Sequence, residues 1–122
     1  MKTSSAKAKG RRQQQFVRDL MLELAPHLQP DDVRSTSMGA SGEDLLLSPA
    51  AREVYPIASE VKNVERINIW AAIRQAEEHA GEGKAPVVHF SRNHAGCYSC
   101  IPTFELLSLY SQLHNYRKGD TT

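Results

Sequence analysis

The spacing of apolar residues along the chain predicts three helices separated by short strands. In the segment Arg11–His27, apolar residues recur every three or four positions, which indicates an amphipathic helix. The same spacing predicts a second helix over residues 64–80. A third helix is expected over residues 103–116, with Phe104 and Leu107 facing inward.

Short apolar or alternating runs bounded by glycine, proline and small polar residues predict the strands. These runs cover residues 33–37, 43–48, 53–62, 86–90 and 98–101. The second and third runs, joined by a turn at residues 49–52, are expected to form an antiparallel hairpin. The predicted order α-β-β-β-α-β-β-α corresponds to an α/β (α+β) fold with a mixed central sheet flanked by helices.

A length of 122 residues suits one domain. We expect a flexible basic arm over residues 1–10, a single domain over residues 11–116 and a disordered tail over residues 117–122. No apolar run is long enough to span a membrane, and no secretory leader is recognisable. With only two cysteines, this composition favours the reducing cytoplasm.

The charge of the chain is unevenly distributed, although the net charge is only +1. Residues 1–18 contain six basic residues and no acidic residue, whereas the remainder contains nine basic and fourteen acidic residues. A basic segment on a mildly acidic body suits a polyanionic partner such as nucleic acid. The alternative is a tail that only keeps the protein soluble.

The candidate chemistry lies at Asp44, Glu60 and Lys62. Residues i and i+2 of a strand share a face, so Glu60 and Lys62 are expected to project together. Asp44 lies on the partner strand of the predicted hairpin, where the strand register can bring its carboxylate beside that of Glu60. Two carboxylates and a backbone carbonyl are hard oxygen ligands suited to Mg²⁺, and Gln75 on the next helix could orient the lysine or a water.

Three segments, GEDLLL, IASEVKN and WAAIRQAE, together resemble the PD-(D/E)XK nuclease superfamily. They are most similar to small phage-encoded members related to archaeal-type Holliday junction resolvases. The resemblance implies that Asp44, Glu60 and the carbonyl of Val61 bind Mg²⁺, for which Mn²⁺ can substitute. It also implies that Lys62 is the catalytic lysine and that Gln75 supports the site from the following helix.

The resemblance covers about residues 9–109 and departs from the superfamily pattern at two places. Glu43 stands before the motif aspartate, where proline is common in the superfamily. Resolvase-type relatives often carry a glutamate on the first helix that reaches the metal, whereas this helix offers the glutamines at residues 13–15.

Polar and basic residues of the first helix and first strand are candidates for contact with DNA phosphates. They are Arg11, Arg12, Gln15, Arg18, Ser35 and Ser37. An ordinary solvated helix face and ordinary turn residues are the alternatives for this set.

A second cluster, His89, His94, Cys97 and Cys100, invites a zinc interpretation. The three-residue spacing of the cysteines argues against it, because side chains at an odd offset on a strand face opposite sides. Cysteines packed as small apolar residues in a hairpin at the sheet edge are the simpler reading.

The sequence therefore predicts a Mg²⁺-dependent endodeoxyribonuclease that hydrolyses phosphodiester bonds in branched DNA, with a Holliday junction as the expected substrate and phage as the expected origin. Such a protein would act in the host cytoplasm, away from membranes. Symmetrical cutting of a junction requires two copies, so a homodimer is expected. Two alternatives remain, a non-catalytic DNA-binding module with the same fold and a small zinc-binding interaction protein.

Overall fold

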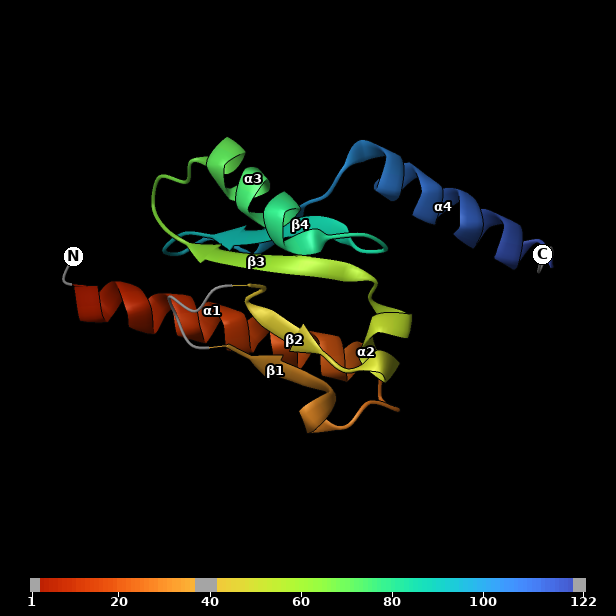
Figure 1. Cartoon of the computed structure of the whole chain (residues 1–122), viewed down its shortest axis with the longest axis horizontal. Helices are drawn as coiled ribbons and strands as arrows, with labels where there is room; N and C mark the ends of the chain where they lie inside the picture. Colours follow the sequence, from red (N-terminus) through yellow and green to blue (C-terminus); the bar gives the residue numbers. More distant parts are fainter. Residues whose placement is uncertain (1–2, 37–41, 120–122) are drawn as a thin grey trace.

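The protein has a mixed α and β architecture in which the predicted order of the main elements is confirmed (Figure 1). The structure, a computed structural model, describes residues 3–36 and 42–119. The elements are α1 (Thr3–Leu24), the short 3₁₀ helix η1 (Pro30–Asp32), β1 (Val33–Ser35), β2 (Leu45–Leu47), α2 (Pro49–Val54), β3 (Ile57–Asn63), α3 (Ile69–Ala80), β4 (Ala85–Ser91), β5 (Tyr98–Cys100) and α4 (Thr103–Arg117).

The strands form two small sheets in the described part of the chain. In one, β1 and β2 are antiparallel, and in the other β4 lies between β3, which runs parallel to it, and β5, which runs antiparallel. Figure 1 shows β3 in the middle of the molecule, with α3 on one side and α1, β1 and β2 on the other.

The predicted hairpin between residues 43–48 and 53–62 is wrong. The first of these strands pairs with β1 and the second pairs with β4. The helix α2 separates the two segments where a tight turn was expected. Its start is encoded locally, since the Ser48 hydroxyl accepts a hydrogen bond from the Ala51 N–H at 3.1 Å and Pro49 occupies the first helical position.

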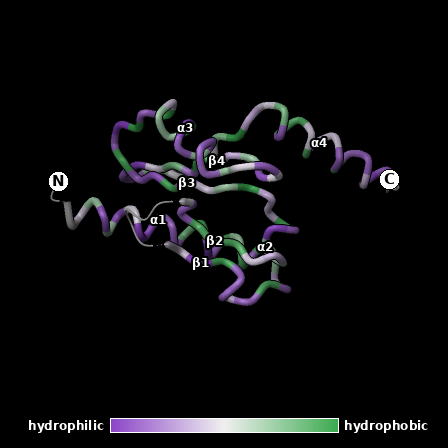
Figure 2. The backbone as a smooth tube through the Cα atoms, in the orientation of Figure 1, coloured by the Kyte–Doolittle hydropathy of each residue, from purple (hydrophilic) through white to green (hydrophobic). Residues whose placement is uncertain are grey.

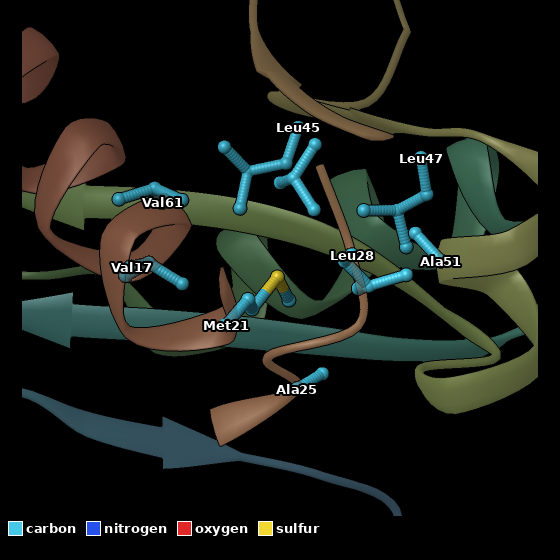
Figure 3. Packing of buried hydrophobic residues seen from close by; sticks show 9 residues of the cluster. Val17, Met21, Ala25, Leu28, Leu45, Leu47, Ala51 and Val61 are labelled. Atoms are coloured by element: carbon cyan, nitrogen blue, oxygen red, sulfur yellow. The ribbon is translucent and has the colours of Figure 1, made fainter. Parts of the chain in front are cut away.

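The main core lies between α1 and the strands on its side of β3. Figure 3 shows Val17 and Met21 of α1 together with Leu45, Leu47 and Val61. A smaller core on the opposite side packs buried residues of α3 against β4. Because side chains alternate along a strand, β3 gives Val61 to the α1 side and Glu60 to the α3 side.

Two helices begin elsewhere than the sequence suggested. Residues 3–10 belong to α1 instead of forming a flexible arm, because this segment is rich in alanine and lysine, and Lys9 and Gly10 at its end are buried. Helix α3 begins at Ile69, not near residue 64, since the side chain of Asn68 accepts a hydrogen bond from the Ala71 N–H at 3.1 Å.

The C-terminal helix α4 contributes nothing to the core, contrary to the expectation that Phe104 and Leu107 face inward. These two side chains are 78% and 61% exposed, and no residue of α4 is buried. Figure 1 shows α4 running away from the body, and Figure 2 shows hydrophobic positions along it. The helix ends at Arg117, inside the segment expected to be a disordered tail, and residues 120–122 of that tail lie outside the described residues.

Across the described residues, no helix combines the length and apolarity that a membrane span requires.

Candidate active site

Asp44 is attached to the edge of β3 by two hydrogen bonds. Its backbone N–H donates to the Ser59 carbonyl at 3.0 Å, and its Oδ2 accepts from the Val61 N–H at 2.7 Å. Gly42, two residues before Asp44, has a φ of 104°, a left-handed conformation that favours glycine. The chain can therefore turn there and bring a carboxylate directly against β3.

Glu43 anchors the same segment from the other side. Its Oε2 lies 2.6 Å from the Lys84 Nζ and 3.9 Å from an Arg52 guanidinium nitrogen. The Lys84 contact is largely removed from solvent, since the two side chains are 17% and 9% exposed. Glu43 therefore fixes the backbone that carries Asp44.

Glu60 is a buried carboxyl group, only 2% exposed, in the middle of β3. Burial is the main reason that its pKa is raised, and the negative charge of Asp44 raises it further. A hydrogen bond from His79 and the positive charge of Lys62 act in the opposite direction. The structure therefore places Asp44 and Lys62 close enough to Glu60 for the charge of each to act on it.

His79 is the site residue that sequence reasoning missed. Its Nδ1 lies 2.6 Å from the Glu60 Oε1, and it reaches Glu60 from the last turn of α3. Gln75, which was expected to support the site from this helix, lies one turn earlier and is exposed. The available signal was the four-residue spacing of Gln75 and His79, which places both on one side of α3.

The arrangement suits a divalent cation with oxygen ligands. Asp44 and Glu60 supply two carboxylates, and a strand residue directs its N–H and its C=O to the same edge. Because the Val61 N–H points to Asp44, the Val61 carbonyl faces that side as well. Two partly desolvated carboxylates repel each other, as the raised pKa of Glu60 records, and a bound cation would relieve that repulsion.

Two of the three glutamines of the first helix, Gln13 and Gln14, are buried against the fold. Gln14 is fully buried and its Oε1 accepts a short hydrogen bond from the Ser35 hydroxyl of β1. Ser35, which was expected to contact DNA, therefore lies partly buried between α1 and β1. Ser37, the neighbouring candidate, lies outside the described residues.

The basic residues of α1 divide into two groups. Arg11 and Arg12 are exposed, as is Gln15. Arg18 is engaged with the fold, because its Nε donates to the Val33 carbonyl at 2.7 Å and its Nη2 donates to the Pro30 carbonyl at 2.8 Å. Of the four candidates on this helix, Arg18 thus holds the chain before β1 in place.

The histidine and cysteine cluster does not assemble into a zinc site. Within residues 3–36 and 42–119, no three His, Cys, Asp or Glu side chains form a group that could hold a metal ion. His89 instead lies between two hydroxyl groups, with Nε2 3.0 Å from Ser59 Oγ and Nδ1 2.7 Å from Ser99 Oγ. Burial lowers the pKa of His89 to about 4, so its ring is neutral at physiological pH.

Comparisons with protein-family models, with curated proteins and with solved structures find no match for this chain.

Proposed function

We propose that this protein is a divalent-metal-dependent endodeoxyribonuclease. The observation that supports the proposal is the contact of Asp44 with β3. The Asp44 Oδ2 accepts a hydrogen bond from the Val61 N–H, and the charge of Asp44 acts on Glu60. Lys62 lies on the same face of β3 as Glu60. A buried carboxyl group with a perturbed pKa and specific charged partners is typical of functional sites.

In this proposal, some residues of the chain bind the cation and Lys62 acts on the scissile phosphate. Asp44, Glu60 and the Val61 carbonyl would hold the cation, and His79 would fix the Glu60 carboxylate. A divalent cation bound there supplies polarisation of the scissile phosphate and activation of the attacking water. The Lys62 ammonium neutralises negative charge that develops on the phosphate as its P–O bond is broken.

Arg11 and Arg12 would hold the DNA through its phosphates, since both are exposed and belong to the basic half of α1. Arg18 is left out of this surface because its guanidinium is bound to the Val33 and Pro30 carbonyls. Branched DNA is the proposed substrate, and this choice rests on the resemblance of the sequence segments to small resolvases.

The second candidate function is DNA binding without cleavage. It would use the same exposed arginines and would leave the Asp44 and Glu60 pair without a role. A binding-only protein gains nothing from a buried carboxyl group beside a second one, because both repel the phosphates of DNA. The carboxylate pair therefore favours the nuclease.

The test is cleavage of a labelled four-way junction and of a matching linear duplex by the purified full chain, in Mg²⁺, Mn²⁺ or EDTA. We expect cutting only with metal. The variants Asp44→Asn and Lys62→Ala should bind the junction as the wild type does and cut it about 10³-fold more slowly or worse. Asp31→Asn and Lys118→Ala, at exposed positions of the same charge types, are the matched controls.

Cleavage that survives Asp44→Asn and Lys62→Ala would remove the proposed site. Junction binding by the wild type with no cutting in any metal would establish the binding-only function instead. Equal cutting of junction and duplex would keep the nuclease and remove the preference for branched DNA.

A further inference from the structure

The helix α4 presents a large apolar surface that nothing in the described chain covers. Seven of its fifteen residues are large apolar or aromatic side chains, each between 40% and 78% exposed. They are Phe104, Leu106, Leu107, Leu109, Tyr110, Leu113 and Tyr116. An isolated helix of this length is marginal in water, so its stability has to come from packing against something.

Five of the seven apolar side chains of α4 lie along one stripe of the helix, and Phe104 and Leu107 lie off it. Leu106, Leu109, Tyr110, Leu113 and Tyr116 follow the spacing i, i+3, i+4, i+7 and i+10. Helices that dock in grooves insert anchor residues at this spacing. The helix thus has the form of a ligand for an apolar groove.

Such a groove lies between α3 and the sheet, with a volume of about 300 Å³. Its walls include Trp70, Ile73 and Ala76 of α3 and Val88 of β4. Trp70 is 69% exposed, which is unusual for the one tryptophan of a small domain. We refer to this feature as the α3 groove.

The α4 helix of the same chain does not fill the α3 groove. Ile101 and Pro102 line the groove themselves, and α4 starts directly after them. Pro102 has an extended conformation, with φ −55° and ψ 137°, and Figure 1 shows that α4 then runs away from α3. The groove and the helix of one chain therefore meet only at their ends.

We infer that the protein forms a two-fold dimer in which α4 of each copy docks in the α3 groove of the other. A two-fold axis near Pro102 would make both contacts at once and leave neither helix uncovered, as a closed symmetric interface requires. Leu, Phe and Tyr side chains at these exposures offer several hundred Å² per chain, which is the scale of the ~800 Å² that each partner of a stable interface buries.

Charge also favours this partner. The α3 groove carries Glu77 on its wall, and α4 carries Arg117 in its last turn. A second copy thus brings an apolar helix with a cation in its last turn to a groove that carries one carboxylate. The dimer does not depend on the nuclease activity, so the two proposals can fail separately.

The first test combines sedimentation with the fluorescence of Trp70, the only tryptophan of the chain. At micromolar concentration the wild type should have twice the 13.6 kDa mass of one chain, with a blue-shifted emission that turns red on dilution. The double variant Leu109→Glu/Leu113→Glu should weaken dimerisation about 100-fold or more and leave the tryptophan exposed. Because α4 has no buried residue, this variant should keep the circular dichroism of the rest of the fold.

A control substitution separates the α3 groove from other apolar surfaces. Leu24→Glu changes a leucine of α1 that is 70% exposed, and it should leave the dimer intact. Loss of the dimer in Leu24→Glu with retention in the α4 double variant would place the interface on α1 and overturn the inference.

The second test mixes two variants that cannot dimerise normally. One carries Leu109→Glu/Leu113→Glu and keeps Trp70, and the other carries Trp70→Ala and keeps α4. Adding an excess of the second should shift the emission of the first to the blue, because an intact α4 then enters an intact groove.

Four results would overturn the inference. They are a monomer at every concentration, a dimer whose tryptophan stays exposed, a monomer whose tryptophan is buried, and a mixture of the two variants without a blue shift.

Discussion

Strand β3 carries two consecutive buried polar residues whose surroundings differ sharply. Ser59 and Glu60 are both 2% exposed and point to opposite faces of the strand. Ser59 belongs to a neutral chain of hydrogen bonds through His89 to Ser99. Glu60 instead lies beside the charge of Asp44 and takes one hydrogen bond from His79.

The difference shows how a buried polar residue that only stabilises the fold can be distinguished from one that belongs to a functional site. Around Ser59 every polar atom named here has a partner and burial keeps His89 neutral, as expected of buried polar groups in a stable interior. Around Glu60, burial and the negative charge of Asp44 both disfavour the charged form and raise the pKa of Glu60. That arrangement costs stability unless a cation completes it, and this is the reason to assign function to that face.

The largest expected effect comes from removing the charge on the Glu60 face. Glu60→Gln should slow cleavage by about 10³-fold or more, since a cation ligand is lost. The melting temperature of the metal-free protein should rise, because a repelled buried charge is removed. Melting curves and cleavage rates would be compared with those of Glu53→Gln, an exposed glutamate on α2. If Glu60→Gln melted at a lower temperature than the wild type and cut DNA at the normal rate, Glu60 would be a residue that stabilises the fold and not one of the site.

On the face of β3 that carries Ser59, the stability associated with neutral His89 should be lost in acid. The pKa of His89 is about 4 in the folded chain, below its ordinary value, so the folded state binds fewer protons than the unfolded state. Its contribution to stability is complete above about pH 6.5 and is lost as the pH falls through 4, by up to about 3 kcal/mol. Urea unfolding of the wild type and of His89→Gln between pH 7.5 and 4 would measure it, and identical slopes would contradict the assignment.

Substitution of His79, which holds the Glu60 carboxylate, should have an intermediate effect on metal affinity. His79→Ala removes the hydrogen bond to the Glu60 Oε1 and leaves Asp44 and Val61 untouched. Metal affinity should fall about 10-fold to 100-fold, the usual range for a partner of a ligand. Gln75→Ala, one turn earlier on α3, is the control and should change affinity little. Equal effects of the two substitutions would deny His79 its positioning role.

The smallest effect concerns the pH dependence of stability on the Glu60 face. The pKa of Glu60 is raised on folding, so its contribution is complete below its ordinary pKa and is lost as the pH rises through the folded-state value. This slope is opposite to that of His89. Glu60→Gln should therefore flatten the loss of stability between the ordinary pKa and the folded-state pKa of Glu60, measured by urea unfolding without metal. A steeper loss in the variant would contradict the raised pKa.

The sequence predicts the elements of the fold better than their pairing. The alternation of apolar residues and their strand propensity locate β3 and β4. Which strands pair depends on the short helix α2 after Ser48, and the sequence pattern predicted a turn for that segment. The inward placement of Phe104 failed because amphipathic spacing marks a face to be buried and cannot say whether the partner is in the same chain.

The candidate site was predictable where it depends on strand periodicity. Glu60 and Lys62 follow from the alternation of β3, whereas Asp44 reaches them through a contact at the strand edge and not through the predicted hairpin. The spacing of His79 from Gln75 places both on one side of α3, but only the packing of α3 on β3 brings His79 to Glu60. Arg18 was misjudged since its backbone partners lie twelve and fifteen residues away.

Calorimetric titration of the metal-free full chain with Mn²⁺ at pH 7.5, repeated with Asp44→Asn, tests the central claim most directly. We predict saturable binding by the wild type, weakened about 100-fold or more by Asp44→Asn, because the proposed site has Asp44 and Glu60 as its two carboxylate ligands. Undetectable binding by the wild type, or equal binding by the two proteins, would contradict the account.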